Sequence, residues 1–287
     1  MLSKKGTALK LFNAFVLFAF ILVSAVGQRS LAQTNSTIRT GRPGQAIGAY
    51  VVGTEIFQVQ SGLDYGSLIS DTSSEHFGVL SSVLRYGLSE RFELSALISF
   101  MNDHQSGSVV PSTSETKSGI SDLHLGFRIN LIDKPDGWKP GLGLQTRFRT
   151  TFVNPDFRSK NLAPILILAT NNKLSSSMAL ATNFGVSYDG STAIPAYLYV
   201  INVSRSFAES WGAFVEVYGR SKSSIGSVYA DTGVAYSVNS DLQFDLYGGG
   251  GRNHGVTDTF VSVGISWRKT PNSDSFKPEA ERVLLEK

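Results

Sequence analysis

The sequence has 287 residues, with 28 glycines, no cysteine and a formal net charge of +3. The lack of cysteine excludes disulfide bridges and thiolate metal sites, and so small a charge argues against a nucleic-acid partner. Only 17% of the residues are charged and the mean hydropathy is near zero, a balance that suits strands with one apolar face.

The first 32 residues have the pattern of a secretory signal peptide. Several lysines precede an apolar run over 11–26, and Ser30-Leu31-Ala32 then offers small residues to a signal peptidase. We expect cleavage before Gln33, with cleavage after Gly27 as the second choice. A retained membrane anchor is the less favoured alternative, because the apolar run is short.

Residues 33–54 are polar and rich in glycine, which predicts a short periplasmic lead-in. Strand-like segments follow over 55–268. Residues 269–287 are polar again and predict a periplasmic tail. The expected organisation is therefore a signal peptide, a lead-in, one β-domain and a tail.

About twelve segments of the β-domain alternate between apolar and polar residues, the period of a β-strand. In the clearest case Phe92, Leu94 and Ala96 lie on one face, and Glu93 and Ser95 lie on the other. The predicted strands are 55–65, the two strands of a hairpin within 77–101, 119–132, 141–152, 163–170, 178–188, 194–206, 211–220, 228–238, 242–248 and 256–268.

Strand length and number predict an all-β fold, an antiparallel transmembrane β-barrel. About ten residues cross a bilayer as a tilted strand, and bacterial single-chain barrels have even strand numbers. Short turns alternate with longer polar connections at 67–75, 102–118 and 153–162, which we expect to be external loops. Both termini would then be periplasmic. A two-layer β-sandwich is the main alternative, and the uniform strand length and the signal peptide argue against it.

The last predicted strand carries Gly264-Ile265-Ser266-Trp267. This run resembles the signature with which outer-membrane barrels present their final strand to the barrel-assembly machinery. We therefore expect an exported protein in the outer membrane of a Gram-negative bacterium, with outer-membrane lipid and the assembly machinery as partners.

If the apolar faces meet lipid, the polar faces line a lumen. Two interpretations stay open: a narrow wet channel between an acidic and a basic wall, which we favour, and a lumen closed by ion pairs. Arg147 and Arg149 are the candidates for the basic wall, and Glu93, Asp122 and Asp245 for the acidic one. The predicted pore-lining residues are Arg85, Glu93, Asp122, His124, Arg128, Arg147, Arg149, Glu216, Arg220, Asp231, Asp245 and Asp258.

The sequence offers little enzyme chemistry. Of the four histidines, only His124 falls on a predicted lumen face, where an ordinary ion pair with Asp122 is the simpler interpretation. No Gly-x-Ser-x-Gly elbow and no metal-ligand cluster stands out. We therefore expect no catalytic residues, metal or cofactor, and a lipid-modifying enzyme is only a third alternative.

Several segments together resemble a family of outer-membrane barrels described as transporters or as the MetA-pathway of phenol degradation. The segments are Ile38 to Gln45, Phe57-Gln58-Val59-Gln60-Ser61-Gly62-Leu63, Leu84 to Leu94, Ser118 to Leu123, Ala230 to Gly233 and Leu242 to Asp245. The resemblance implies passage of small molecules, aromatic ones included, and brings no catalytic residues. The expected function is a passive channel for small solutes. The main alternative is a non-conducting barrel whose external loops, chiefly 102–118, bind a partner or a surface.

Overall fold

The computed structural model describes residues 37–107, 114–133, 139–223, 225–253 and 255–271. The predicted signal peptide and nearly all of the predicted tail lie outside these ranges. Within the described residues, no helix is long and apolar enough to span a membrane.

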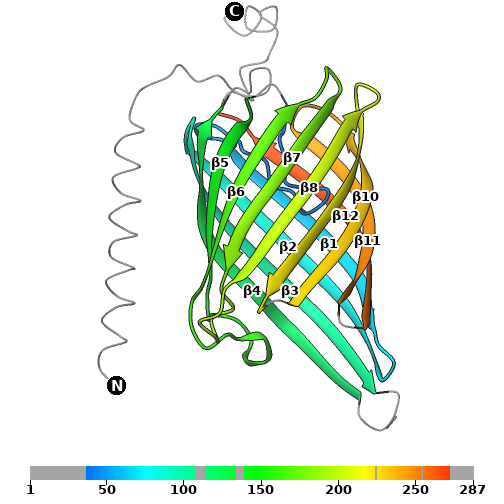
Figure 1. Ribbon diagram of the computed structural model, residues 1–287. Helices are drawn as coiled ribbons and strands as arrows, with labels where there is room; N and C mark the ends of the chain where they lie inside the picture. The colour runs from blue at the N-terminus through cyan, green and yellow to red at the C-terminus, as the bar shows by residue number, and fades with distance from the viewer. Residues whose placement is uncertain (1–36, 108–113, 134–138, 224, 254, 272–287) are drawn as a thin grey trace, which may run out of the picture.

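Twelve antiparallel strands form one closed barrel, as the sequence pattern predicted (Figure 1). Each strand pairs with its neighbours in the chain, and β1 closes the ring against β12. A 3-10 turn at Pro155–Phe157 is the one other element assigned in the described part of the chain. The strands are β1 (Phe57–Ile69), β2 (Ser73–Ser89), β3 (Phe92–Gly107), β4 (Ser114–Ile132), β5 (Gly141–Arg149), β6 (Ala163–Lys173), β7 (Met178–Ser187), β8 (Ala196–Ser206), β9 (Trp211–Lys222), β10 (Ile225–Ser237), β11 (Leu242–Asn253) and β12 (Val256–Lys269).

The barrel is apolar outside and polar inside. On β3, the side chain of Leu94 points outward and is 45% exposed, whereas that of the next inward residue, Glu93, is 1% exposed. The same division runs around the ring, because successive side chains on a strand point to opposite faces. This inside-out burial is the arrangement of a barrel that places its outer face in lipid.

Two segments that the sequence predicts as external loops are mostly strand. β1 continues to Ile69 and β2 begins at Ser73, so the 67–75 connection shrinks to a tight turn. β3 and β4 continue as a long hairpin that projects beyond the rim (Figure 1). In the projecting part of this hairpin both faces meet water, so the residues are polar on both faces and the alternation with apolar residues is lost. Backbone hydrogen bonds between β3 and β4 keep the two strands extended.

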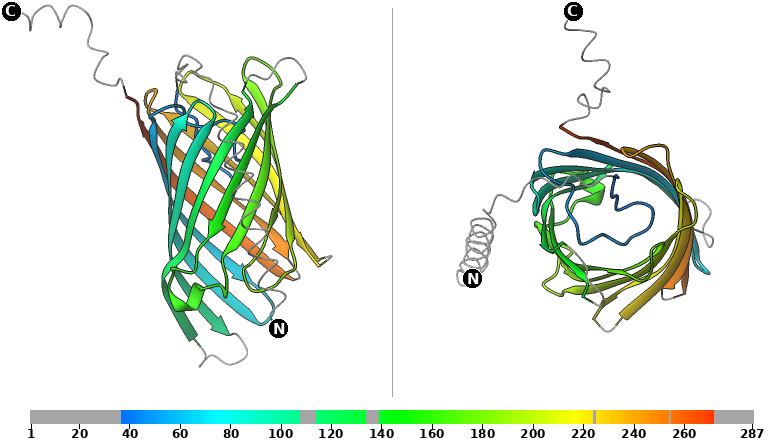
Figure 2. Two further views of the ribbon diagram at one scale, coloured as in Figure 1. Left: turned by 90° about the vertical axis from the view of Figure 1, so that its left-hand side faces the viewer. Right: turned by 90° about the horizontal axis from the view of Figure 1, so that it is seen from above.

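The N-terminal segment, residues 37–56, lies inside the barrel, where Figure 2 shows it as a loop within the ring of strands. The sequence predicted it as a periplasmic lead-in up to residue 54, so its placement differs from that expectation. Ala49, Val51, Val52 and Ile56 are buried in the lumen. Burial of these apolar side chains away from water favours the inside position.

Candidate functional site in the barrel lumen

The N-terminal segment is hydrogen-bonded to inward-facing side chains on much of the ring. On β9, the Glu216 carboxylate accepts the backbone N–H groups of Gln45 at 2.7 Å and Ala46 at 2.9 Å. On β7, Asn183 accepts the N–H of Ile47 at 2.8 Å and donates to its carbonyl at 2.9 Å. The wall thus satisfies backbone groups of an irregular segment that would otherwise be buried without partners.

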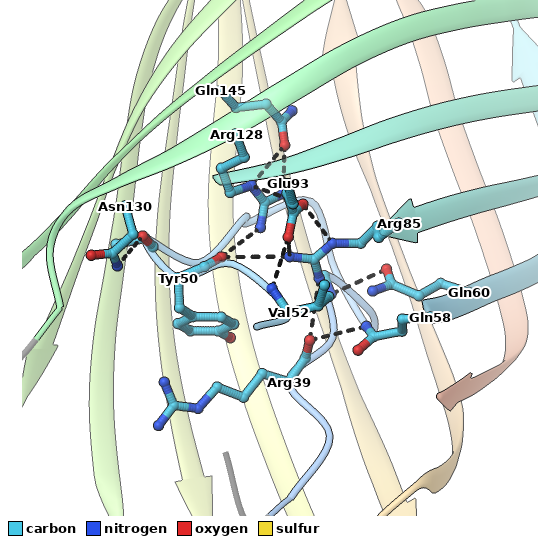
Figure 3. Close-up of polar contacts among 12 residues, drawn as sticks. Arg39, Tyr50, Val52, Gln58, Gln60, Arg85, Glu93, Arg128, Asn130 and Gln145 are labelled. Atoms are coloured by element: carbon cyan, nitrogen blue, oxygen red, sulfur yellow. Dashed lines mark hydrogen bonds and ion pairs between the residues drawn. The ribbon is translucent and has the colours of Figure 1, made fainter. Parts of the chain in front are cut away.

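Another attachment is built on a buried ion pair between the neighbouring strands β2 and β3. Arg85 Nη2 lies 2.7 Å from Glu93 Oε2, and Arg85 Nε donates to Glu93 Oε1 at 2.8 Å. The same Glu93 carboxylate accepts the N–H of Val52 at 2.9 Å (Figure 3). One carboxylate therefore joins the wall to the N-terminal segment, and burial makes such charge-assisted bonds strong.

Strand β4 extends this attachment. Arg128 Nη1 donates to the Tyr50 carbonyl at 3.1 Å, and Arg128 Nε donates to Gln145 on β5 at 3.2 Å. Asn130 donates to the Ala49 carbonyl at 2.9 Å. Both Arg128 and Asn130 are buried, so residues 49–52 are held from the adjacent strands β3 and β4 by groups shielded from water.

A second ion pair holds the segment at β11 and β12, beside the seam where β12 pairs with β1. Arg42 Nη2 is 2.9 Å from Asp245 Oδ1 and donates to Ser262 Oγ at 2.8 Å. Burial disfavours the charge of Arg42, and the Asp245 carboxylate outweighs that effect, so the pKa of Arg42 is raised above its ordinary value. The guanidinium stays charged at any physiological pH.

Asp122, His124 and Arg149 form a separate cluster on β4 and β5. Arg149 Nε lies 2.6 Å from Asp122 Oδ1, and His124 Nε2 lies 3.4 Å from the same oxygen. The sequence placed Arg149 and Asp122 on facing walls, and this is wrong. They meet on one wall because the β4–β5 register pairs His124 with Arg149, two residues from Asp122.

The remaining predicted pore-lining residues are spread around the ring. Arg147 is half-buried on β5, and its Nε has no hydrogen-bond partner among the described residues. On β10, both buried carboxylate oxygens of Asp231 also lack a partner within those residues. Arg220 is exposed on β9 and donates to Ser187 at 3.3 Å. Asp258, on β12, is half-buried.

Sequence reasoning missed the inner half of the site: Arg39, Arg42, Tyr50 and the backbone of residues 45–52. The sequence contains one indication that this segment is buried. The run Ala49-Tyr50-Val51-Val52 is too apolar for a segment in water. In the part of the chain that the structure describes, no group of three or more His, Asp or Glu residues could hold a metal ion. The arrangement is suited to filling and narrowing a lumen.

Comparison with known protein families shows to which family the chain is related. The profile of the family "Putative MetA-pathway of phenol degradation" matches residues 40–268. The chain belongs to this family. The match begins inside the N-terminal segment, so the family pattern includes the lumen segment as well as the twelve strands.

Solved structures show the same fold. An outer-membrane channel from Pseudomonas putida F1 aligns with a TM-score of 0.61 and 10% identity, over 81% of this chain and all (100%) of that one. The β-domain of the Bordetella autotransporter Brka aligns with a TM-score of 0.53 and 14% identity, over 74% and 99%. The translocator domain of NalP from Neisseria meningitidis aligns at 0.50 and 11%, over 76% and 89%. At these identities the likeness concerns the barrel alone. The comparison with curated proteins found no match.

Proposed function

We propose that this member of the family is an outer-membrane channel for the passive passage of small solutes, and that residues 37–56 restrict its lumen. The observation that carries the proposal is the attachment of this segment to β3, β4, β7, β9 and β11 inside a closed barrel with an apolar exterior. A barrel of twelve strands lies between the filled eight-stranded and the open sixteen-stranded types. A segment of the chain can therefore decide whether such a lumen conducts.

The proposed orientation places the turns at 174–177, 207–210 and 238–241, with both ends of the described chain, on the periplasmic side. The projecting β3–β4 hairpin then lies outside the cell. Short periplasmic turns and longer external extensions are the usual asymmetry of outer-membrane barrels. The exit of the N-terminal segment at the short-turn end supports this orientation, since Ile38 donates to the Ser240 carbonyl in the 238–241 turn at 2.7 Å.

Deletion of residues 37–54 tests the proposal. We expect single-channel conductance in a planar bilayer to rise several-fold over that of the full chain, because the lumen loses its filling while the strands keep their pairing. A shift of the folded band on heating, seen by electrophoresis, controls for barrel formation. A folded barrel whose conductance does not rise would contradict the proposal and favour the partner-binding alternative, in which the β3–β4 hairpin is the functional surface.

The barrel that lacks residues 37–54 also tests the proposed pore-lining residues. Replacing Arg147 and Arg149 with Glu is expected to move the reversal potential in a salt gradient toward cation selectivity, since a change of four charge units on β5 alters the field of a narrow lumen. The control changes Arg91, exposed in the β2–β3 turn, and Lys269, exposed at the end of β12, to Glu. An equal shift in both variants would show that Arg147 and Arg149 do not line the path.

A further inference from the structure

A cavity of about 460 Å³ lies between the N-terminal segment and the wall formed by β6 to β11. Its opening is at the short-turn end, because Ser175, Ser176 and Ser177 of the β6–β7 turn line it. Small-molecule sites are commonly of this size. On the opposite side the segment is hydrogen-bonded to β2, β3 and β4, and the free space lies along β6 to β11.

Small side chains on the wall produce this space. Ala181 on β7 and Ala235 on β10 line the cavity. Larger apolar groups lie at its margin, where Tyr50 of the N-terminal segment and Phe214 of β9 are also lining residues. The surface can therefore accept a flat apolar body of modest size.

The charge of the cavity has one sign. Arg39 and Lys173 line it and are exposed, and neither forms an ion pair with any described residue. Arg42 also lines it but is paired with Asp245. No Asp or Glu is among the lining residues. Two uncompensated cations at one cavity attract an anion and repel a cation.

One of the two cations is held in place. The Arg39 carbonyl accepts hydrogen bonds from Arg85 Nη1 at 3.2 Å and Gln58 Nε2 at 3.1 Å, and its guanidinium lies 5.0 Å from the centre of the Tyr50 ring (Figure 3). The Tyr50 carbonyl accepts from Arg128 at 3.1 Å. The buried anchor thus fixes the backbone of both residues, which reduces the entropy lost when a ligand binds.

We propose that this cavity binds a small organic carboxylate, with its charge near Arg39 and Lys173 and its apolar body against Tyr50 and the alanine-lined wall. The role of this cavity rests on the proposed function, because the cavity would determine which class of solute enters the channel at the short-turn end. Charge-assisted hydrogen bonds from guanidinium and ammonium groups are the strongest available to a carboxylate.

Calorimetric titration of the refolded full chain in detergent tests the binding without any current measurement. Benzoate is the probe, benzamide its neutral counterpart of the same shape, and acetate the anion without an apolar body. We expect benzoate to bind at least about tenfold more tightly than either. The variant Arg39→Gln/Lys173→Gln should lose at least about tenfold in benzoate affinity.

A matched variant, Arg91→Gln/Lys269→Gln, removes two exposed cations outside this cavity and should bind benzoate like the parent. Equal binding of benzamide would overturn the role of charge, and equal binding of acetate would overturn the role of the apolar body. Equal loss in both double variants, or no benzoate binding by a folded parent, would overturn the site. None of these outcomes depends on whether the barrel that lacks residues 37–54 conducts, so either proposal can fail without the other.

Discussion

Replacing Glu93 with Gln is expected to release the N-terminal segment from the wall and to increase conductance. Glu93 is the counter-charge for Arg85 at 2.7 Å and lies 3.8 Å from Arg128. Without it, two buried guanidinium groups share one site with no carboxylate. Breaking a buried ion pair on one side typically costs about 3–5 kcal/mol. The segment can relieve that cost by leaving and letting water enter.

The chain has no cysteine, so a single reporter thiol measures the release. Val52→Cys places the thiol at a position that is 4% exposed. We expect a maleimide to label it slowly in the otherwise unchanged barrel and about a hundredfold faster with Glu93→Gln, since about 3 kcal/mol corresponds to that factor. Glu115→Gln, at an exposed ion pair with Lys117, is the control and should leave labelling unchanged. Equal labelling rates in all three proteins would refute the anchoring role of Glu93.

Gly87→Val is expected to displace the end of the N-terminal segment by steric overlap. A side chain at Gly87 would meet the Gly53 carbonyl at a distance no real contact allows. Gly87 also exchanges hydrogen bonds with the segment, accepting from Glu55 at 2.8 Å and donating to Ile56 at 3.0 Å. Overpacking of this kind typically costs about 1–3 kcal/mol. Because a carbonyl of the backbone cannot rotate away like a side chain, we expect the segment to move.

The matched control lies on the same strand. A side chain at Gly78 would meet nothing within 4 Å, so Gly78→Val should leave the conductance at the parent level, whereas Gly87→Val should raise it. Both proteins are first checked for the heat-dependent shift of a folded barrel. If the two folded variants conduct alike, residues 53–56 do not limit the current.

Most of the barrel wall could be predicted from the sequence. Each predicted strand is present, because alternation such as that of Phe92, Glu93 and Leu94 leaves only one way to face lipid and lumen. Strand ends were less well predicted, as at Gly107 and Ser114, where polar residues continue the hairpin past the apolar band. Backbone pairing, which side-chain type hardly reveals, sets those ends.

Only part of the candidate site could be predicted from the sequence. The alternation identified Arg85, Glu93 and Arg128 as inward-facing, and the structure buries all three. It gave no hint that their partners are the backbone groups of Tyr50 and Val52. A backbone carbonyl is the same at every residue, so a sequence pattern cannot show which one an arginine will meet.

Local pattern therefore determined which residues of this protein face lipid, how many strands cross and in what order they pair, because a pleated strand ties the face of each side chain to its position in the chain. The tertiary structure alone decided what fills the barrel. Closing the ring brings Arg42 to Asp245, 203 positions apart in the sequence, and turns residues 37–56 inward. Such contacts depend on the shape of the closed lumen, which no single strand contains.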